Sequence, residues 1–348
     1  MKKISGYISK KVAEKLDKLF NTDRAEFEKK WDDIRIFIEY GMLTDEKFYE
    51  SALKFFLLKD VSGKYYSLED YKKLVEPNQT DKDSTLIYLY TTDPTAQYSY
   101  IKAAEDKGYD VLLMTGELDE HFMSMLESKN EKLRFVRVDS DIPERLIAKE
   151  DEKKNNLSGL QRDIITGIFS KSMPKVEGAE FIVSLESLGE DASPATVTQN
   201  EFMRRMKKMA EQQQGMGFMS NMPDNYMLVV NVDHPAVKRV LEDADADLAS
   251  KVAPLFEKIN SLNSELSTLR DSKAAENASE EKKEELRKEA EVKEKEVADL
   301  RSEQEKLIAG YADGQNLPNQ IIDLALLRSN LLKGSELNDF INRSIALL

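Results

Sequence analysis

The sequence predicts a multidomain protein that combines α/β and α+β architecture. Three observations support this fold class: apolar residues recur at helical spacing early in the chain, strands then alternate with helices, and the last part contains two strands followed by long helical stretches. With 348 residues, the chain is long enough for about two to three domains of ordinary size.

Residues 1–75 are expected to form a helical coil. Val12, Leu16 and Leu19 recur at helical spacing, and the run WDDIRIFIEYG continues the pattern until Gly41, where we expect the helix to stop. The segment SLEDYKKLVE begins with the signature of a capping box at Ser67, which predicts a further helix.

Residues 76–145 are expected to form a small three-layer αβα subdomain. Asp93 and Pro94 predict the start of its first helix, and GELDEHFMSML predicts a second helix. Short connections between alternating strands and helices favour parallel pairing. The predicted strands are TLIYLY at 85–90, DVLLMT at 110–115 and LRFVRVD at 133–139.

The remainder of the chain is expected to form a second, α+β domain. Residues 146–175 are predicted to be a linker with a leading helix, because they are polar around DEKKNNLSG. Residues 176–348 then form the domain itself, in which EFIVSLES and NYMLVVNV read as strands.

Residues 252–312 are predicted to form an antiparallel helical hairpin. Two apolar seams with near-heptad spacing flank the polar stretch DSKAAENASEE, and Lys293 and Gln304 interrupt the second seam. One long solvated helix, or a disordered charged arm, remains an alternative. The seams consist of Leu255, Ile259, Leu262, Leu266 and Leu269, and of Leu286, Ala290, Val297, Leu300 and Leu307.

Two short apolar helices are expected at the C-terminus. Their stripes must be buried, either against their own domain or against a second copy in a two-fold four-helix bundle. The stripes consist of Ile321, Leu324, Leu327 and Leu331, and of Leu337, Phe340, Ile341, Ile345 and Leu348.

Composition excludes several classes of function. The formal charge of −14 disfavours binding of nucleic acid over the whole surface, and the lack of cysteine excludes disulfides and thiolate metal sites. Two distant histidines, His121 and His234, offer little for a metal site or a catalytic triad. No phosphate-binding loop, membrane span or signal peptide is present, so we expect a soluble cytoplasmic chain without a catalytic or metal site.

A methionine-rich segment is the main candidate for a binding site. Residues 201–227 contain seven of the thirteen methionines. Phe202, Met206 and Met209 lie on one helical face, beside arginines and lysines, and such pliable apolar surfaces suit promiscuous contacts. An ordinary amphipathic helix that docks on its own domain is the alternative.

A second candidate is the helix that carries Glu120, His121 and Phe122. A lone histidine is more often an exposed or core-edge residue than a ligand, and Phe122 can pack on the sheet. If these side chains instead face outward beside the methionine segment, the two would form one amphiphilic surface.

The order of these segments resembles bacterial HtpG-type chaperones of the ninety-kilodalton heat-shock protein family. The resemblance rests on KKISGYISKKVAEKLDKLF, WDDIRIFIEYGMLTDEKF, SLEDY, GYDVLLMTGELDEHFMSML, DLALLRSNLL and NDFINRSIALL. It implies that residues 1–145 correspond to the later part of the middle domain, and the later residues to the C-terminal dimerisation domain. The nucleotide-binding domain has no counterpart, so the resemblance implies a fragment.

The resemblance also implies roles for the candidate residues. Phe202, Met206 and Met209 match the apolar positions of the family's client-contacting helix. Glu120 and His121 match client-contacting positions, although His121 stands where bacterial relatives often carry tryptophan. The terminal helices match the dimerising pair, which favours the four-helix bundle, whereas residues 252–312 depart from the usual pattern as an insertion.

The resemblance therefore predicts a chaperone of the heat-shock response that binds non-native client proteins as a homodimer. It implies no enzymatic activity for this chain, and ATP and magnesium as cofactors of a whole protein with an ATPase domain. Another protein, such as a co-chaperone, is a candidate partner for the hairpin, whereas nucleic acid and membrane are not expected. The alternative functions are a methionine-rich module for RNA or signal segments, and a coiled-coil scaffold that acts through residues 252–312.

Overall fold

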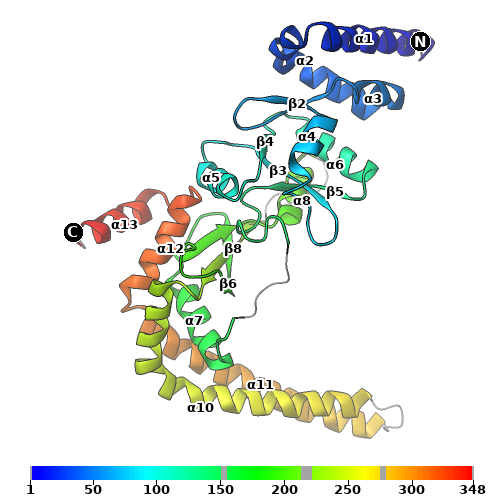
Figure 1. The fold of residues 1–348 in the computed structure, drawn as a ribbon. Coiled ribbons are helices and arrows are strands. Elements are labelled where there is room, and N and C mark those ends of the chain that lie inside the picture. Colours follow the sequence, from blue (N-terminus) through cyan, green and yellow to red (C-terminus); the bar gives the residue numbers. More distant parts are fainter. Residues whose placement is uncertain (1, 150–154, 213–221, 275–279, 347–348) are drawn as a thin grey trace. The chain divides into compact units, whose positions relative to one another are not determined.

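The computed structural model describes residues 2–149, 155–212, 222–274 and 280–346 (Figure 1). The chain forms two compact units. The first contains residues 1–152 and 198–222, and the second contains residues 153–197 and 223–348. No helix within the described ranges is long and apolar enough to cross a membrane.

The first unit begins with three helices, α1 (Lys2–Thr22), α2 (Arg24–Thr44) and α3 (Glu46–Ala52). The Asp23 and Asp45 side chains accept backbone N–H groups at the starts of α2 and α3, as N-caps do. The prediction that the helix stops at Gly41 is wrong, because α2 continues to Thr44. Gly41 instead permits close packing, since a Cβ atom there would lie 2.7 Å from the Phe48 ring.

A short antiparallel pair, β1 (Leu57–Lys59) and β2 (Tyr65–Ser67), follows and was not predicted. Helix α4 (Leu68–Val75) comes next, and its predicted start is confirmed. The Ser67 hydroxyl accepts a hydrogen bond from the Asp70 backbone N–H over 3.1 Å.

The next part of the unit contains a three-stranded parallel sheet with the order β4-β3-β5. All three strands were predicted. One helix start was wrong: the Asp93 side chain accepts the Thr95 and Ala96 N–H groups in a turn, so α5 begins only at Tyr98. The elements are β3 (Leu86–Thr91), α5 (Tyr98–Asp106), β4 (Val111–Leu113), α6 (Asp119–Lys129) and β5 (Leu133–Arg137).

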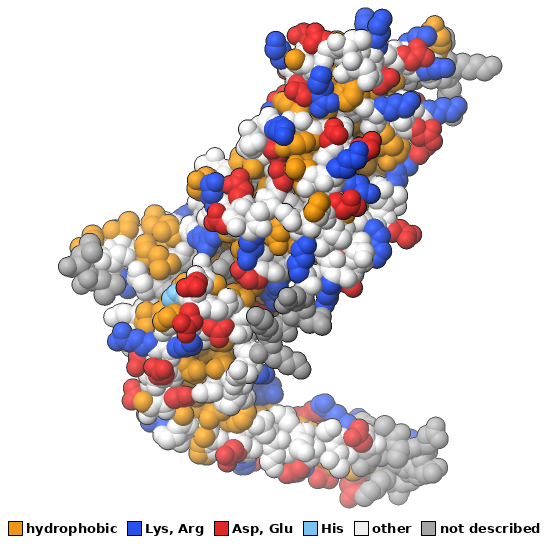
Figure 2. Space-filling view, in the orientation of Figure 1, with side chains coloured by type: hydrophobic (Ala, Val, Ile, Leu, Met, Phe, Trp, Pro, Cys, Tyr) orange, Lys and Arg blue, Asp and Glu red, His pale blue; other side chains and the backbone are white. Residues whose placement is uncertain are grey.

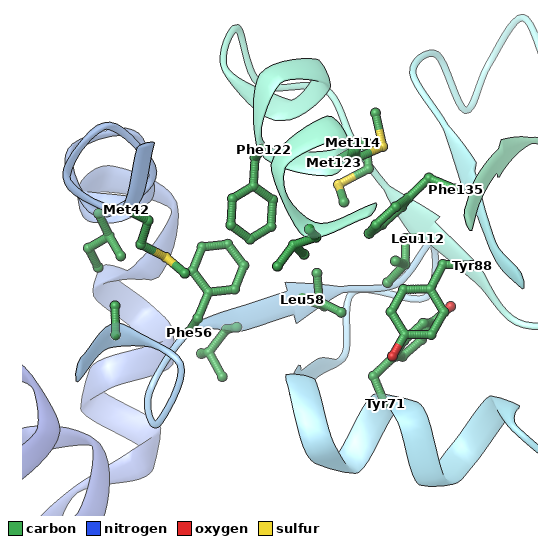
Figure 3. Close-up of a cluster of buried hydrophobic side chains, with 14 of the residues drawn as sticks. Met42, Phe56, Leu58, Tyr71, Tyr88, Leu112, Met114, Phe122, Met123 and Phe135 are labelled. Atoms are coloured by element: carbon green, nitrogen blue, oxygen red, sulfur yellow. The ribbon is translucent and has the colours of Figure 1, made fainter. Parts of the chain in front are cut away.

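One aromatic core joins the helical part of this unit to the sheet (Figure 3). Phe122 of α6 stacks on Phe56 with ring centroids 4.3 Å apart, and Tyr71 of α4 packs edge-on against Tyr88 of β3. Burial of several large aromatic side chains stabilises the arrangement by the hydrophobic effect and by ring contacts. The core therefore fixes α6 against both the helical part of the unit and the sheet.

The first unit also includes α8 (Glu201–Gln212). The sequence assigned this segment to the domain that begins at residue 176, but residues 198–222 group with the first unit. The physical reason is a set of ion pairs between α8 and the β3–α6–β5 region, described below.

The second unit contains a three-stranded sheet with the order β6-β8-β7, in which β6 and β8 are parallel. The strands β6 and β8 were predicted, and β7 was missed. Helix α7, which lies in the segment predicted as a linker with a leading helix, packs on this sheet through Ile164, Ile165, Ile168 and Phe169, which are fully buried. The elements are α7 (Gly159–Ser172), β6 (Ala179–Glu186), β7 (Ala195–Thr198) and β8 (Asp224–Asn231).

Two long helices, α10 (Pro235–Ala274) and α11 (Glu280–Ala312), run side by side in the second unit (Figure 1). The predicted boundary at residue 252 does not coincide with a helix end, because α10 begins at Pro235 and continues through Pro254. Val252 of α10 and Ile308 of α11 are buried in the core around α7. The unit ends with α12 (Asn316–Arg328) and α13 (Gly334–Ala346).

Candidate functional site

Helix α8 is the amphipathic element of the candidate site. The Asn200 side chain accepts the Met203 N–H over 3.1 Å at the helix start. The segment before the helix is held by Asp139, whose carbonyl accepts the Gln199 N–H, and by Arg137, whose guanidinium donates to the Gln199 side chain. These bonds tie the start of α8 to the end of β5 and the residues that follow it.

The inner face of α8 forms a network of ion pairs with α6 and β3. Arg204 donates to the Glu120 carboxylate of α6 over 2.8 Å and to the Tyr90 hydroxyl of β3 over 2.6 Å. Lys208 reaches the same Glu120 oxygen over 3.0 Å. The Tyr90 hydroxyl in turn donates to Glu201 of α8 over 2.6 Å. Glu120 is therefore shared between two cations of α8.

A second arginine anchors the helix to β5. Arg205 donates to Glu127 of α6 over 2.9 Å and to the Phe135 carbonyl of β5 over 2.8 Å. It also donates to Glu201 over 2.5 Å. The other Glu127 oxygen accepts the Phe135 N–H over 2.6 Å, which fixes the carboxylate. The Arg205 guanidinium thus joins α8, α6 and β5.

The network shifts the pKa values of its members. Burial raises the pKa of Glu201, but attraction to Arg204 and Arg205 outweighs burial and leaves it below its ordinary value. Burial also raises the pKa of Glu120, but hydrogen bonds from Arg204 lower it by more, so the pKa lies below its ordinary value. Burial raises the pKa of the Tyr90 hydroxyl, and the Glu201 charge adds to this effect. The carboxylates are ionised and the phenol is neutral at pH 7.

The outer face of α8 is apolar and exposed. Phe202 is 67% exposed and Met203 is 42% exposed, whereas Met206 is partly buried. The side chain of Met209 lies outside the described part, as do residues 213–221 of the methionine-rich segment. Exposed aromatic and methionine side chains on one helix offer an adaptable contact surface for apolar segments.

The predicted site residues on α6 lie in three different environments. Glu120 is brought against α8, and His121 is exposed beside it. Phe122 does not face outward, because it is fully buried and stacks on Phe56. The candidate role of Phe122 in client contact therefore requires correction: it packs in the core, which was the alternative for this residue.

The sequence reasoning missed three residues of this site. Met203 is exposed beside Phe202 but lies outside the predicted face. Tyr90 and Glu127 hold α8 in place, yet neither was singled out. One signal was available for Glu127: it follows Glu120 by seven residues, so both carboxylates lie on one face of α6, opposite the arginine pair.

A second charged cluster lies at the junction of α2 and α6. Arg35 donates to Glu39 over 2.6 Å and also pairs with Asp119, whose other oxygen accepts the Gly116 N–H over 2.9 Å. Burial raises the pKa of Glu39 to about 7, and attraction to Arg35 only partly offsets this. One arginine thus serves two buried carboxylates.

The terminal helices expose part of the predicted dimerisation stripes. Leu324 and Leu327 of α12, and Ile341 and Ile345 of α13, are between 42% and 62% exposed. Figure 2 shows hydrophobic side chains gathered over α13. The remaining stripe residues pack wholly or partly on their own unit, apart from Leu348, which lies outside the described residues; they are Ile321, Leu331, Leu337 and Phe340.

The two residues that interrupt the second apolar seam have defined partners. Lys293 of α11 pairs with Glu265 of α10 over 2.5 Å, and Gln304 donates to Asp163 of α7 over 3.3 Å. Between α10 and α11 lies a small separate core of Ile259, Leu262, Leu266 and Val297. The interruptions are therefore contacts between helices.

Groups of three or more histidine or acidic side chains that could hold a metal ion were not found in the part of the chain that the structure describes. The geometry of α8 and α6 offers ion pairs, one phenol and an exposed apolar face. These features suit the binding of polypeptide segments.

Comparison with known proteins identifies the family of this chain. The family described as Hsp90 protein matches residues 1–307. The chaperone protein HtpG of Bacteroides thetaiotaomicron is 47% identical over 351 residues, which cover 100% of this chain and 51% of the relative. The HtpG of Porphyromonas gingivalis W83 is 45% identical, with the same two coverages, and that of Francisella tularensis subsp. novicida is 26% identical over 73% of this chain and 40% of its own length.

The chain spans about half the length of the HtpG relatives that it matches throughout, at 51%. The family match covers most of the chain, and the identity to these relatives extends over all of it. The chain therefore belongs to the Hsp90 protein family, and its relatives are HtpG chaperones.

Proposed function

We propose that this chain binds non-native client proteins through the outer face of α8. The observation that carries the proposal is the exposure of Phe202 and Met203 on a helix whose opposite face is fixed by ion pairs. A fixed helix that presents apolar side chains to solvent loses little conformational entropy when a client binds. Methionine adapts to clients of different shape.

The arginines of α8 argue against the RNA-binding alternative. Arg204 and Arg205 are paired with Glu201, Glu120 and Glu127, and their side chains are only 9% and 15% exposed. A phosphate group would have to displace these carboxylates. We therefore assign the basic side of α8 to docking on its own unit.

We also propose that the chain forms a homodimer through α12 and α13. Exposed Leu324, Leu327, Ile341 and Ile345 leave an apolar surface that a second copy can cover as a four-helix bundle. The HtpG relatives support this proposal by family membership. We further propose that α10 and α11 form an antiparallel hairpin, which offers a separate surface to a partner protein.

We propose that the whole protein acts in the cytoplasm and contains a nucleotide-binding domain outside this chain, which hydrolyses ATP with magnesium. Hydrolysis would change the spacing between the α8 surfaces of the two protomers. Within this chain we assign no catalytic residue. ATP hydrolysis by these 348 residues alone would contradict this assignment.

The test is suppression of aggregation of an unfolding protein without nucleotide. The variant Phe202→Ser, Met203→Ser, Met206→Ser should lose most of the suppression, whereas Tyr98→Ser should keep it. Tyr98 is a matched control, since it is 61% exposed on α5 of the same unit. Equal suppression by both variants and the unsubstituted chain would refute the assignment to α8.

A further inference from the structure

Strand β6 forms one edge of the sheet in the second unit, since the strand order is β6-β8-β7 (Figure 1). The opposite edge strand, β7, consists entirely of buried residues, whereas every residue of β6 is exposed or partly buried. An accessible edge strand offers its unpaired backbone groups to another extended chain. β6 is therefore the edge of this sheet at which a further strand can pair.

Alternate residues of β6 direct their backbone groups away from the sheet. The Gly178 carbonyl accepts the Asp224 N–H over 2.8 Å, and the Glu186 carbonyl accepts the Val232 N–H over 2.9 Å. The even-numbered residues of β6 therefore form the hydrogen bonds to β8. Because backbone direction alternates along a strand, the N–H and carbonyl groups of the odd-numbered residues point to the outer side.

The outer side of β6 is closed near the end of the strand and open in its middle. Near the end, the Asn155 side chain donates to the Leu185 carbonyl over 3.0 Å, which confirms the outward direction of that carbonyl. Among the described residues, the outward N–H and carbonyl groups of Phe181 and Val183 have no hydrogen-bond partner. Their donors and acceptors alternate with the spacing that an added strand would meet.

A mainly apolar groove borders this open stretch. It has a volume of about 540 Å³ and is lined by β6 and by the residues that follow α7. The exposed side chains of Lys175 and Glu177 also contribute to its lining. A cavity of this size can take apolar side chains of a bound segment. Its apolar lining consists of Met173, Pro174, Val176, Ala179, Phe181 and Val183.

The other face of β6 carries an exposed apolar residue and a carboxylate. Ile182 is 64% exposed and lies beside Met227 of β8 in the strand register. Glu180 is exposed, and neither Glu180 nor Glu177 forms an ion pair with another residue that the structure describes. Charge complementarity therefore favours a basic residue opposite Glu180 in any strand that pairs with β6.

We propose that the outer edge of β6 binds an extended segment of a partner protein, which adds a fourth strand to this sheet. The segment is apolar at the alternate positions that face the groove, and it carries a basic residue opposite Glu180. Backbone hydrogen bonds to Phe181 and Val183 supply affinity, and the groove supplies selectivity. The site uses no residue of α8 or of the terminal helices, so the inference goes beyond the proposed client binding and dimerisation.

The probe is a fluorescent peptide with the sequence KVTVRVTVK, which alternates valine with polar and basic residues. Anisotropy measures its binding to the 348-residue chain. Two further versions of the peptide carry N-methyl groups on alternate residues, one on the valines and the other on the residues between them. Each version keeps its side chains but loses the N–H groups along one edge of the extended peptide.

One methylated version should bind at least about tenfold more weakly than the unmethylated peptide, because it loses its hydrogen bonds to β6. The other should bind like the unmethylated peptide, since its methyl groups point to solvent. Loss with methylated valines would indicate an antiparallel added strand, and loss with the other version a parallel one. Equal affinities of the two methylated versions would overturn the proposal, as would the absence of measurable binding of the unmethylated peptide.

Two variants of the chain locate the site on β6. Val183→Pro removes an outward N–H group and leaves the hydrogen bonds to β8 intact, so it should weaken peptide binding at least about tenfold. Glu180→Lys reverses the charge of an exposed side chain and should weaken binding about two- to fivefold. The matched control is Glu257→Lys, at an exposed position of α10, which should leave binding unchanged.

Glu180→Lys keeps the test decisive if circular dichroism shows that Val183→Pro unfolds. Equal peptide affinities of Glu180→Lys and Glu257→Lys would overturn the proposal, as would unchanged affinity in a folded Val183→Pro variant. Aggregation suppression through α8 does not involve β6. A chain that suppresses aggregation but does not bind the peptide would retain the proposed function and refute this inference.

Discussion

Arg204 of α8 and Glu120 of α6 form an ion pair with a nitrogen–oxygen distance of 2.8 Å, although 84 residues separate them in sequence. The pair joins the two segments that the sequence had singled out as separate candidates. It places the cationic side of α8 inward, and among the described side chains of the helix Phe202 and Met203 are the exposed ones.

Glu120→Gln should loosen α8. The change removes one charged partner from the largely buried guanidinium of Arg204. It should lower the free energy that holds α8 in place by about 1–2 kcal/mol. Hydrogen exchange in residues 201–212 should accelerate about five- to thirtyfold, since α8 opens locally. Glu117→Gln serves as the control. Unchanged exchange in α8 would show that this ion pair does not hold the helix.

Phe122→Ala should mainly lower the stability of the fold, whereas Phe202→Ala should mainly weaken client binding. Phe122 is fully buried against Phe56, so its truncation should lower the free energy of unfolding by about 3–5 kcal/mol. Phe202 is 67% exposed, so its truncation should change stability by less than about 0.5 kcal/mol while weakening client binding. Urea denaturation measures both variants, and similar losses would contradict the assigned burial.

Much of this fold could be predicted because its signals are local. The strands of the first sheet showed apolar runs, and Ser67 showed a capping pattern. Gly41 misled the prediction because its role is close packing against Phe48, a contact that forms only in the folded chain. The short strands β1 and β2 lacked a distinctive pattern over three residues each.

The site could be predicted only in part. The spacing of Phe202 and Met206 indicated an apolar face of α8. The pairing of Arg204 and Arg205 with α6 joins distant positions. The spacing of Glu120 and Glu127 indicates that they share a face of α6, but it does not indicate which segment of the chain meets that face. Phe122 was ambiguous for the same reason, since a phenylalanine on an amphipathic helix fits both a core and a surface until its neighbours are known.

The Arg35–Glu39–Asp119 cluster predicts a pH dependence of stability. The folded-state pKa of Glu39 is about 7, above its ordinary value of 4.5, so the folded state binds a proton that the unfolded state releases between these values. Stability should therefore fall as pH rises through this window, by up to about 3 kcal/mol. The lowered pKa values of Glu120 and Glu201 act below this window, where stability falls as pH falls.

Glu39→Gln should flatten the fall between pH 4.5 and 7, because glutamine does not titrate. Urea denaturation across this range, with Glu117→Gln as a control, measures the difference. An identical pH profile for Glu39→Gln and the unsubstituted chain would exclude Glu39 as the titrating group.

The proposed dimer predicts a clear effect at α13. Ile341→Asp with Ile345→Asp places two charges on the exposed apolar stripe and should convert the dimer to a monomer in sedimentation. Val292→Asp is a suitable control, since Val292 is 69% exposed on α11 and lies outside the stripe. A dimer that persists in the double variant would place the interface elsewhere.

Site-directed crosslinking tests client binding by α8 most directly. One variant carries a photoreactive phenylalanine at position 202 and the other carries it at position 98; the native residues are 67% and 61% exposed. Each variant is mixed with the same client, a reduced and alkylated protein that stays unfolded, and the crosslink yields are compared. The account predicts strong crosslinks from position 202 and few from position 98. Equal yields at both positions, or none at position 202 while the client is bound, would contradict it.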